Sequence, residues 1–219
     1  MKIVISLGGS VLSPDDPEFI GKIADLVREA SKTVVLYIII GGGKTARTYI
    51  AAARSFTKDT KKLDEIGILA TKMNALLLAT ALDVPFRLPS TVEEAARGRS
   101  PLLVMGGTTP GHSTDTVGAE LAVRINADKY IIASNVNGVY TADPKIDKNA
   151  KKYESISIDD LIGLCGKKWQ PGLNVIVDSE ACKVIKKGKI KTVVLNGKDL
   201  TSLRNAIFNK RFDGTIIEV

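Results

Sequence analysis

The sequence predicts an α/β protein, folded as a three-layer α/β/α sandwich around a mainly parallel sheet. Apolar strand-like runs alternate with helix-like segments along all 219 residues. The apolar runs are continuous and not alternating, which is typical of strands that are covered on both faces. No internal repeat and no low-complexity linker divides the chain. We therefore expect one domain with two lobes, about residues 1–128 and 129–219.

In the N-terminal lobe, short β-rich runs predict strands at 2–6, 33–40, 84–88 and 101–105. The segment 19–30 is expected to be a helix because its apolar residues share one face: Ile20, Ile23, Val27 and Ala30. Apolar periodicity also predicts a helix at 45–56 and a long amphipathic helix over 59–82. Thr91 and Glu94 have the spacing of a capping box, which predicts a helix start there, and a further helical segment covers 116–128.

In the C-terminal lobe, the expected strands are 129–134, 191–195 and 214–219, with helices at 178–188 and 199–208. The stretch 141–172 is the most polar part of the chain. We interpret it as an excursion from the sheet, such as a hairpin and a loop.

The net charge of +7 suits an anionic partner. The lysines are densest at 183–191, which we interpret as a solvated face, and aromatic residues make up only 5% of the chain, so few side chains can stack on nucleic-acid bases. Small phosphorylated ligands fit this diffuse charge equally well. We expect no nucleic-acid partner.

The remaining composition indicates a cytoplasmic protein without a membrane partner. Cys165 and Cys182 form no metal-binding pair and are expected to be small buried hydrophobes. The start "MKIVISLGGS" is typical of a strand and not of a signal peptide. No apolar run approaches the ~20 residues of a membrane span.

Five apolar runs end in turns of small residues: Gly8-Gly9-Ser10, Gly41-Gly42-Gly43, Gly106-Gly107, Asn135 to Gly138 and Asn196-Gly197. Ligands of open parallel sheets bind at the carboxyl ends of the strands. Glycine there lets backbone N–H groups approach a ligand, and a following helix N-terminus favours an anion. The repeated turns predict a phosphate-binding site, although neither a Walker P-loop nor a G-x-G-x-x-G fingerprint is present.

Four segments appear in an order that resembles the amino acid kinase superfamily, and within it the archaeal type of UMP kinase: "LGGSVL" (7–12), "GGGKTAR" (41–47), "GGTTPGHSTD" (106–115) and "SNVNGVYTADPK" (134–145). The resemblance covers almost the whole chain. "NGVYTADP" is its most specific mark for the superfamily, and "GGTTPGHSTD" separates UMP kinases from carbamate, aspartate and glutamate kinases. The resemblance implies an amino acid kinase-like fold and the transfer of a phosphoryl group from ATP to UMP, with Mg²⁺ held mainly by the ATP phosphates and not by a protein metal site.

The resemblance also implies roles for individual residues. The N-terminal lobe would bind UMP through Gly42, Asp64, Thr109, Pro110, Gly111, His112, Ser113, Thr114 and Asp115. The C-terminal lobe and the first turns would bind ATP through Gly9, Ser10, Gly43, Arg47, Ser134, Asn135, Tyr140 and Asp143. His112 is expected to contact the ligand or to stabilise the loop, because the ionised phosphate of UMP needs no strong base.

Three positions depart from the superfamily pattern. Ser6 and Ile176 stand where many members carry a lysine, and Asn135 stands where many carry an aspartate. The expected catalytic groups are therefore Lys44, as the first candidate for the catalytic cation, and Arg47. Phosphoryl transfer needs positive groups over the transferred oxygens more than it needs covalent chemistry.

Two alternatives remain beside UMP kinase. Another kinase of the superfamily, such as one acting on isopentenyl phosphate, would need a more apolar acceptor pocket than "TTPGHSTD" offers. A non-catalytic nucleotide-binding or storage protein is favoured only by the missing lysine at Ser6. The apolar surface of the helix 59–82 and the resemblance together predict a homo-oligomer, a hexamer.

Overall fold

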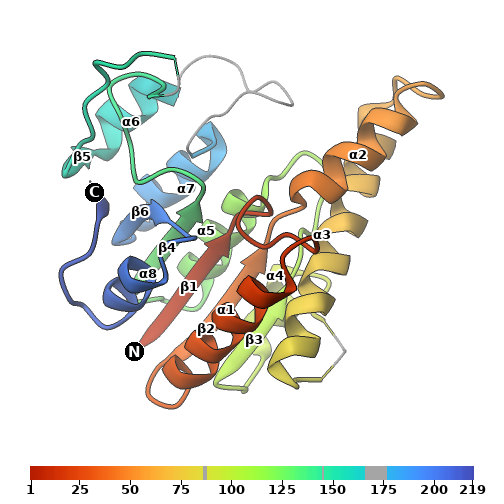
Figure 1. Cartoon of the computed structure of the whole chain (residues 1–219), viewed down its shortest axis with the longest axis horizontal. Coiled ribbons are helices and arrows are strands. Elements are labelled where there is room, and N and C mark those ends of the chain that lie inside the picture. Colours follow the sequence, from red (N-terminus) through yellow and green to blue (C-terminus); the bar gives the residue numbers. More distant parts are fainter. Residues whose placement is uncertain (86–87, 145, 166–176) are drawn as a thin grey trace.

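We describe a computed structural model of the chain, which covers residues 1–85, 88–144, 146–165 and 177–219 (Figure 1). The strands are β1 (Lys2–Leu7), β2 (Val35–Ile40), β3 (Leu102–Met105), β4 (Lys129–Ser134), β5 (Ser155–Ser157), β6 (Thr192–Asn196) and β7 (Gly214–Glu218). The helices are α1 (Pro17–Ala30), α2 (Gly43–Ala53), α3 (Thr60–Leu82), α4 (Val92–Arg97), α5 (Thr114–Arg124), α6 (Ile158–Cys165), α7 (Ser179–Gly188) and α8 (Leu200–Ile207).

The described strands form one seven-stranded sheet in the order β3-β2-β1-β4-β6-β7-β5. Neighbours from β3 to β6 pair in parallel, β7 is antiparallel to β6, and β5 pairs in parallel with β7. The sheet thus continues without a break from the N-terminal half of the chain into the C-terminal half. The expected α/β class and mainly parallel sheet are confirmed.

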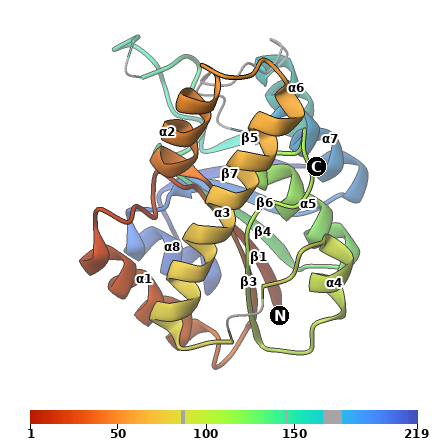
Figure 2. The same ribbon diagram turned by 90° about the vertical axis from the view of Figure 1, so that its right-hand side faces the viewer.

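Alternating side chains of the strands build two cores, one on each face of the sheet. Ile3, Ile5 and Leu7 of β1 pack with α1, α3 and α8. Val4 of β1 faces the other way and packs with α4, α5 and α7. The two helical layers with the sheet between them make the expected three-layer sandwich, which is seen edge-on in Figure 2.

Local sequence signals explain where the helices begin and end. Asp16 accepts a hydrogen bond from Phe19 N at the start of α1, and Thr91 accepts one from Glu94 N at the start of α4. Glu94 reaches back to the backbone N–H of Ser90, which completes the expected reciprocal cap one residue earlier than the standard pattern. α3 ends at Asp83, whose φ of 55° places it in the left-handed region.

Two expectations about the elements were wrong. Val84, Pro85 and Leu88 lie outside any strand, because Val84 N still bonds to Ala79 O in the terminal turn of α3; the rest of the expected strand 84–88 falls outside the described residues. The polar stretch 141–172 contains more than a hairpin and a loop. Tyr140 and Lys152 do form an antiparallel bridge, but β5 and α6 follow it.

α3 is long and apolar enough to cross a membrane, by length and composition alone. In the fold it packs against α1, α2, β2 and β3 (Figure 2). This packing explains the buried part of its apolar surface, while Leu69 and Met73 remain exposed. Cys182 is likewise fully buried beside α5, as expected; the side chain of Cys165 falls outside the description.

Candidate active site

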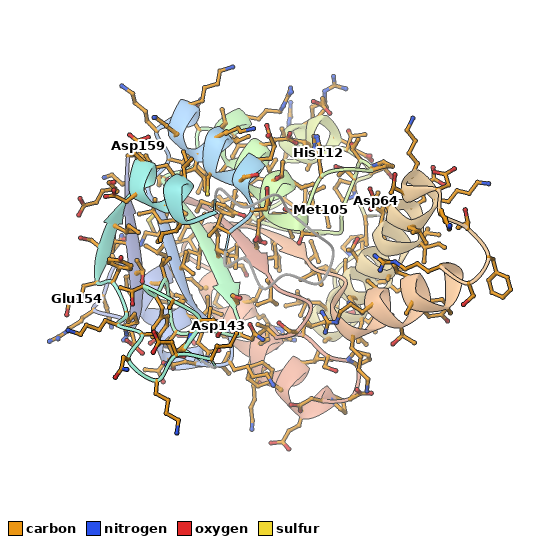
Figure 3. All side chains as sticks on the ribbon, turned by 90° about the horizontal axis from the view of Figure 1, so that it is seen from above. Asp64, Met105, His112, Asp143, Glu154 and Asp159 are labelled. Atoms are coloured by element: carbon orange, nitrogen blue, oxygen red, sulfur yellow. The ribbon has the colours of Figure 1, made fainter. Side chains whose placement is uncertain are left out.

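A large cleft lies at the carboxyl ends of the parallel strands. The strand register aligns Leu7 with Ile40 and Ala133, and Ser134 with Asn196, so the turns after these strands meet at one edge of the sheet. A cavity of about 1090 Å³ opens there between the N-terminal and C-terminal halves. Figure 3 looks toward this edge, with Asp64 and His112 on one side and Asp143 on the other.

Most residues that the sequence singled out line this cleft: Ser10, Gly42, Gly43, Arg47, Asp64, Thr109, Gly111, His112, Ser113, Thr114, Ser134, Asn135, Tyr140 and Asp143. They come from segments more than a hundred residues apart, from Ser10 to Asp143, and the fold brings them to one cavity. At about 1090 Å³ the cleft is at the top of the roughly 300–1,000 Å³ range of small-molecule pockets, so it has ample room for a nucleotide.

Four candidates are not among the lining residues: Gly9, Lys44, Pro110 and Asp115. Gly9 lies directly behind the lining, against Gly41 and Gly43. The Lys44 ammonium lies 2.9 Å from Asp15 Oδ2, and its side chain is 73% exposed. Ile176, one of the three positions that depart from the superfamily pattern, falls outside the described residues.

The first two glycine turns interlock beneath the cleft. A Cβ on Gly9 would lie 2.1 Å from Gly43 N and 2.5 Å from Gly41 O, so no side chain fits there. Gly43 also has a φ of +55°, which other residues rarely adopt. Asn74, which is buried on α3, donates hydrogen bonds of 2.9 Å to Gly41 O and 3.2 Å to Gly42 O. The tri-glycine turn is thus held from both sides.

The N-terminus of α2 is an anion-binding element that faces the cleft. α2 begins at Gly43 with no side-chain cap and no acidic residue in its first turn. The unpaired N–H groups of the first turn and the helix dipole favour a negative ligand there. Arg47, one turn along α2, also lines the cleft, and Arg54 lines it at the other end of the helix. This arrangement can hold a phosphate.

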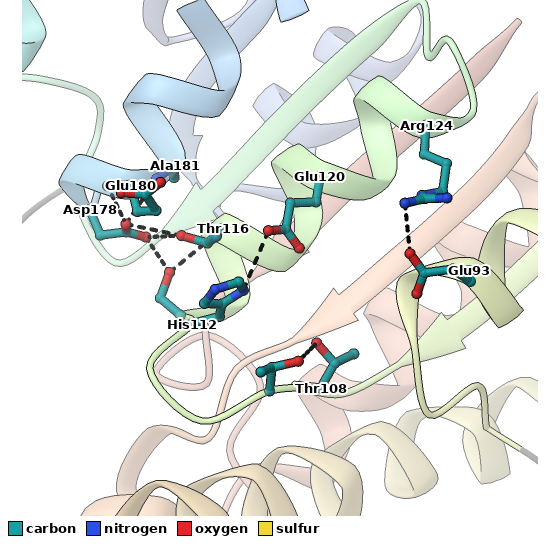
Figure 4. A network of polar contacts seen from close by, with 11 residues as sticks. Glu93, Thr108, His112, Thr116, Glu120, Arg124, Asp178, Glu180 and Ala181 are labelled. Carbon is teal, nitrogen blue, oxygen red and sulfur yellow. Dashed lines mark hydrogen bonds and ion pairs between the residues drawn. The ribbon is translucent and has the colours of Figure 1, made fainter. Parts of the chain in front are cut away.

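Residues 106–113 form the β3–α5 loop, which three acidic side chains contact: one from α3, one from α5 and one from the residue before α7. Gly111 N donates to Asp64 of α3 at 2.9 Å. His112 Nδ1 lies 3.4 Å from Glu120 of α5, and Ser113 Oγ donates to Asp178, which precedes α7 (Figure 4). The start of the loop is fixed as well, because Gly107 N donates to Thr71 Oγ1 at 2.7 Å.

Beneath this loop, Asp115 is a partly buried residue. Ser6 Oγ donates a hydrogen bond to it, and Tyr130 donates one of 2.9 Å to its backbone oxygen. Burial raises the pKa of Asp115 to about 6, against the lowering effect of the Ser6 hydroxyl and with a further rise from the Asp178 charge. Ser6, the position of a lysine in many superfamily members, therefore serves as the donor to Asp115.

The C-terminal side of the cleft comes from the segment after β4. Gly138 has a φ of +132°, and a Cβ there would lie 2.5 Å from Thr215 Oγ1. Thr215 accepts from Val139 N at 2.9 Å and donates to Tyr153 O at 2.6 Å. β7 thus fixes the "NGVY" turn that carries Tyr140 into the lining.

Sequence reasoning missed several residues of the site: Thr71, Asn74, Glu120 and Asp178. Thr71 and Asn74 could have been found from the sequence, because they are polar positions three residues apart on one face of an apolar helix. Polar residues in such a position indicate a hydrogen-bonding role. Asp178 stands directly before a helix, which indicates a cap but not its contact with a loop 65 residues away. Among the described residues, no group of three or more His, Cys, Asp or Glu side chains could hold a metal ion.

Comparison with known proteins agrees with this geometry. The model of the amino acid kinase family matches residues 1–196. The chain is 41% identical to a uridylate kinase of Methanococcus aeolicus, with 99% of each chain covered, and 40% identical to one of Thermococcus onnurineus, with all of each covered. The crystal structure of uridylate kinase from Archaeoglobus fulgidus superposes with a TM-score of 0.89 at 40% identity, over 99% of this chain and 100% of that one. This protein therefore belongs to the amino acid kinase family.

Proposed function

We propose that this protein is a UMP kinase, which transfers the γ-phosphoryl group of ATP to UMP and gives UDP and ADP for pyrimidine nucleotide biosynthesis. The observation that carries the proposal is the single cleft, which joins the β3–α5 loop and Asp64 to the α2 N-terminus and the segment after β4. The similarity to uridylate kinases over the whole chain supports the same activity.

In this proposal the N-terminal lobe, about residues 1–128, binds UMP, and the C-terminal lobe, about 129–219, binds ATP. UMP contacts Gly42, Asp64 and the loop residues Thr109, Pro110, Gly111, His112, Ser113 and Thr114, and Asp115 supports the loop from beneath. ATP contacts Gly43, Arg47, Ser134, Asn135, Tyr140 and Asp143, and Gly9 and Ser10 shape the turn under its phosphates.

The reaction requires the two phosphates to meet in line. A phosphate oxygen of UMP forms a bond to the γ-phosphorus, and the bond from that phosphorus to the bridging oxygen of ADP breaks. The UMP phosphate is already ionised, so no residue has to remove a proton. The glycine turn at 41–43 leaves room for the two phosphates, and the amides of α2, Arg47 and Lys44 are the proposed positive groups.

Mg²⁺ would enter on the phosphates of ATP and neutralise part of their charge. Mg²⁺ bound to nucleotides keeps several waters and needs one or two protein carboxylates or none. Asp143, in the segment proposed to bind ATP, lines the cleft and is a carboxylate of the kind that such a Mg²⁺ ion can use. The cytoplasm, where ATP and UMP are found, is the proposed location.

A coupled assay of ADP release with UMP, CMP, dUMP and isopentenyl phosphate tests the function. We expect fast turnover of UMP and slow turnover of CMP. Fast turnover of isopentenyl phosphate would favour the other superfamily kinase, whose acceptor is apolar. Nucleotide binding without any turnover would favour a storage protein.

A further inference from the structure

Asp178 joins the start of α7 to the β3–α5 loop. Its Oδ1 accepts from Glu180 N and Ala181 N, both at 2.9 Å, and so caps α7. Its carboxylate also accepts from Thr116 Oγ1 at 3.0 and 3.1 Å and, through Oδ2, from Ser113 Oγ (Figure 4). All four groups are donors, which matches an ionised carboxylate.

Ser113 is the residue through which this carboxylate reaches the loop. It caps α5, because its Oγ accepts from Thr116 N at 3.0 Å while donating to Asp178. The caps of α5 and α7 are therefore linked by one hydrogen bond between Ser113 and Asp178. Since Ser113 lines the cleft, the carboxylate decides where the last residue of the loop lies.

A second aspartate that caps a helix, Asp199, shows that capping does not by itself require a contact like the one between Asp178 and Ser113. Asp199 caps α8 with the same geometry, accepting from Thr201 N and Ser202 N at 3.0 Å each. Those bonds stay within α8, and Asp199 does not line the cleft. Capping alone thus requires no contact with a distant loop.

We propose that Asp178 is a positioning residue for UMP. It fixes Ser113 and through it the β3–α5 loop, although it belongs to the C-terminal half of the chain. The inference rests on the proposed function, in which that loop binds UMP. If Asp178 has this role, a residue of the C-terminal half helps to position UMP through Ser113. The two halves then do not bind their substrates independently.

The test compares Asp178→Asn with Ser113→Ala, the double variant and the control Asp199→Asn, all as full chains. In Asp178→Asn the amide oxygen can still cap α7, but the amide nitrogen cannot accept from the Ser113 hydroxyl. We expect KM for UMP to rise about tenfold, as for the loss of one hydrogen bond to a charged group. KM for ATP and kcat should change much less, because the contact positions the acceptor in both ground and transition states.

Two further results identify the Ser113 contact as the cause. The double variant should be no worse for UMP than the weaker-binding single variant, because both changes remove the same hydrogen bond. Asp199→Asn should leave KM for UMP within about twofold of the wild type, as expected for a distant site. Unfolding curves of Asp178→Asn and Asp199→Asn show whether the two variants are equally stable, so that a difference in KM for UMP does not come from a difference in stability.

Unchanged KM for UMP in Asp178→Asn would overturn the inference, and so would equal losses in Asp178→Asn and Asp199→Asn. Additive effects of Asp178→Asn and Ser113→Ala would overturn it as well. If the wild-type protein does not phosphorylate UMP, the proposed function itself is rejected. The wild-type activity is therefore measured first.

Discussion

Arg47 and Lys44 lie within one turn of each other on α2, but their side chains lie in different surroundings. Arg47 lines the cleft, whereas Lys44 pairs with Asp15. We expect Arg47→Ala to lower kcat by about 10²–10³, the scale for losing one group that stabilises developing charge. Lys44→Ala should lower kcat less than Arg47→Ala does. Steady-state kinetics with saturating ATP and UMP measures both.

The matched control for Lys44 is Asp15→Ala, which removes the partner and keeps the cation. It should leave kcat unchanged if Lys44 rests at the surface during the reaction. A higher kcat would mean that Asp15 holds Lys44 away from the phosphates. A larger loss in Lys44→Ala than in Arg47→Ala would make Lys44 the main catalytic cation.

Asp115 should make stability depend on pH. Its folded-state pKa is about 6 and its unfolded value is 3.8, so between these values the folded protein binds more protons. The free energy of unfolding therefore falls as the pH rises from about 4 to about 7, by on the order of 3 kcal/mol from this group. Asp115→Asn, which cannot ionise, should gain stability relative to the wild type over the same interval. Urea unfolding at pH 4.5 and 7.5, values chosen to bracket about 6, measures the difference.

Asp25→Asn on α1 controls for the loss of one negative charge, because Asp25 is exposed. A stability difference between Asp115→Asn and the wild type that does not vary with pH would contradict the prediction. At this scale the sequence marked Asp115 as a UMP contact, whereas the structure places it behind the cleft lining, where Ser6 donates a hydrogen bond to it. Its surroundings include Ser6, Tyr130 and Asp178, which are far apart in the chain and carry no local signal of contact.

The glycine turns are the elements on which the cleft depends most. Gly9→Ala places a methyl group within 2.1 Å of Gly43 N, and that atom belongs to a backbone that Asn74 holds in place. We expect the free energy of unfolding of this variant to fall by about 3 kcal/mol or more, because the added methyl group can fit only if the backbone moves. Affinity for ATP should fall as well. Chemical unfolding and a nucleotide-binding titration measure the two effects.

Gly21→Ala is the matched control, because a Cβ at this position in α1 meets no atom of the described residues within 4 Å beyond its own helix and chain neighbours. It should stabilise the protein by about 0.5–1 kcal/mol, since alanine favours the helix. Equal stability of Gly9→Ala and the wild type would mean that the two turns can separate without cost.

Elements with strong periodic or continuous apolar patterns could be predicted from the sequence, and weakly marked ones could not. The long run 60–82 and the buried strands at 35–40 and 129–134 appear close to the expected bounds. β5 has three residues and exists through its pairing with β7, which is 60 residues away. The expected strand at 84–88 has a β-rich composition, but Val84 N donates a hydrogen bond to Ala79 O in the terminal turn of α3.

For the whole molecule, α3 presents apolar side chains that the described part of the chain leaves exposed. Leu69 and Met73, one turn apart, are 61% and 56% exposed, while the opposite face of the helix is buried. Exposed apolar positions in line on one element are typical of an interface. Together with the proposed function they lead us to predict a homohexamer. Light scattering at micromolar concentration should give about 140 kDa, six times the 23.4 kDa of one chain.

Glutamate at these positions should break that assembly. Leu69→Glu with Met73→Glu buries two charges in the proposed contact, which costs several kcal/mol per interface when the charges have no partners. Ile146→Glu is the control, since Ile146 is 85% exposed and lies in the connection between β4 and β5. The double variant should run at a lower mass while Ile146→Glu keeps the wild-type mass. A hexamer that survives the double variant would place the interface elsewhere, and a wild-type monomer would reject the assembly itself.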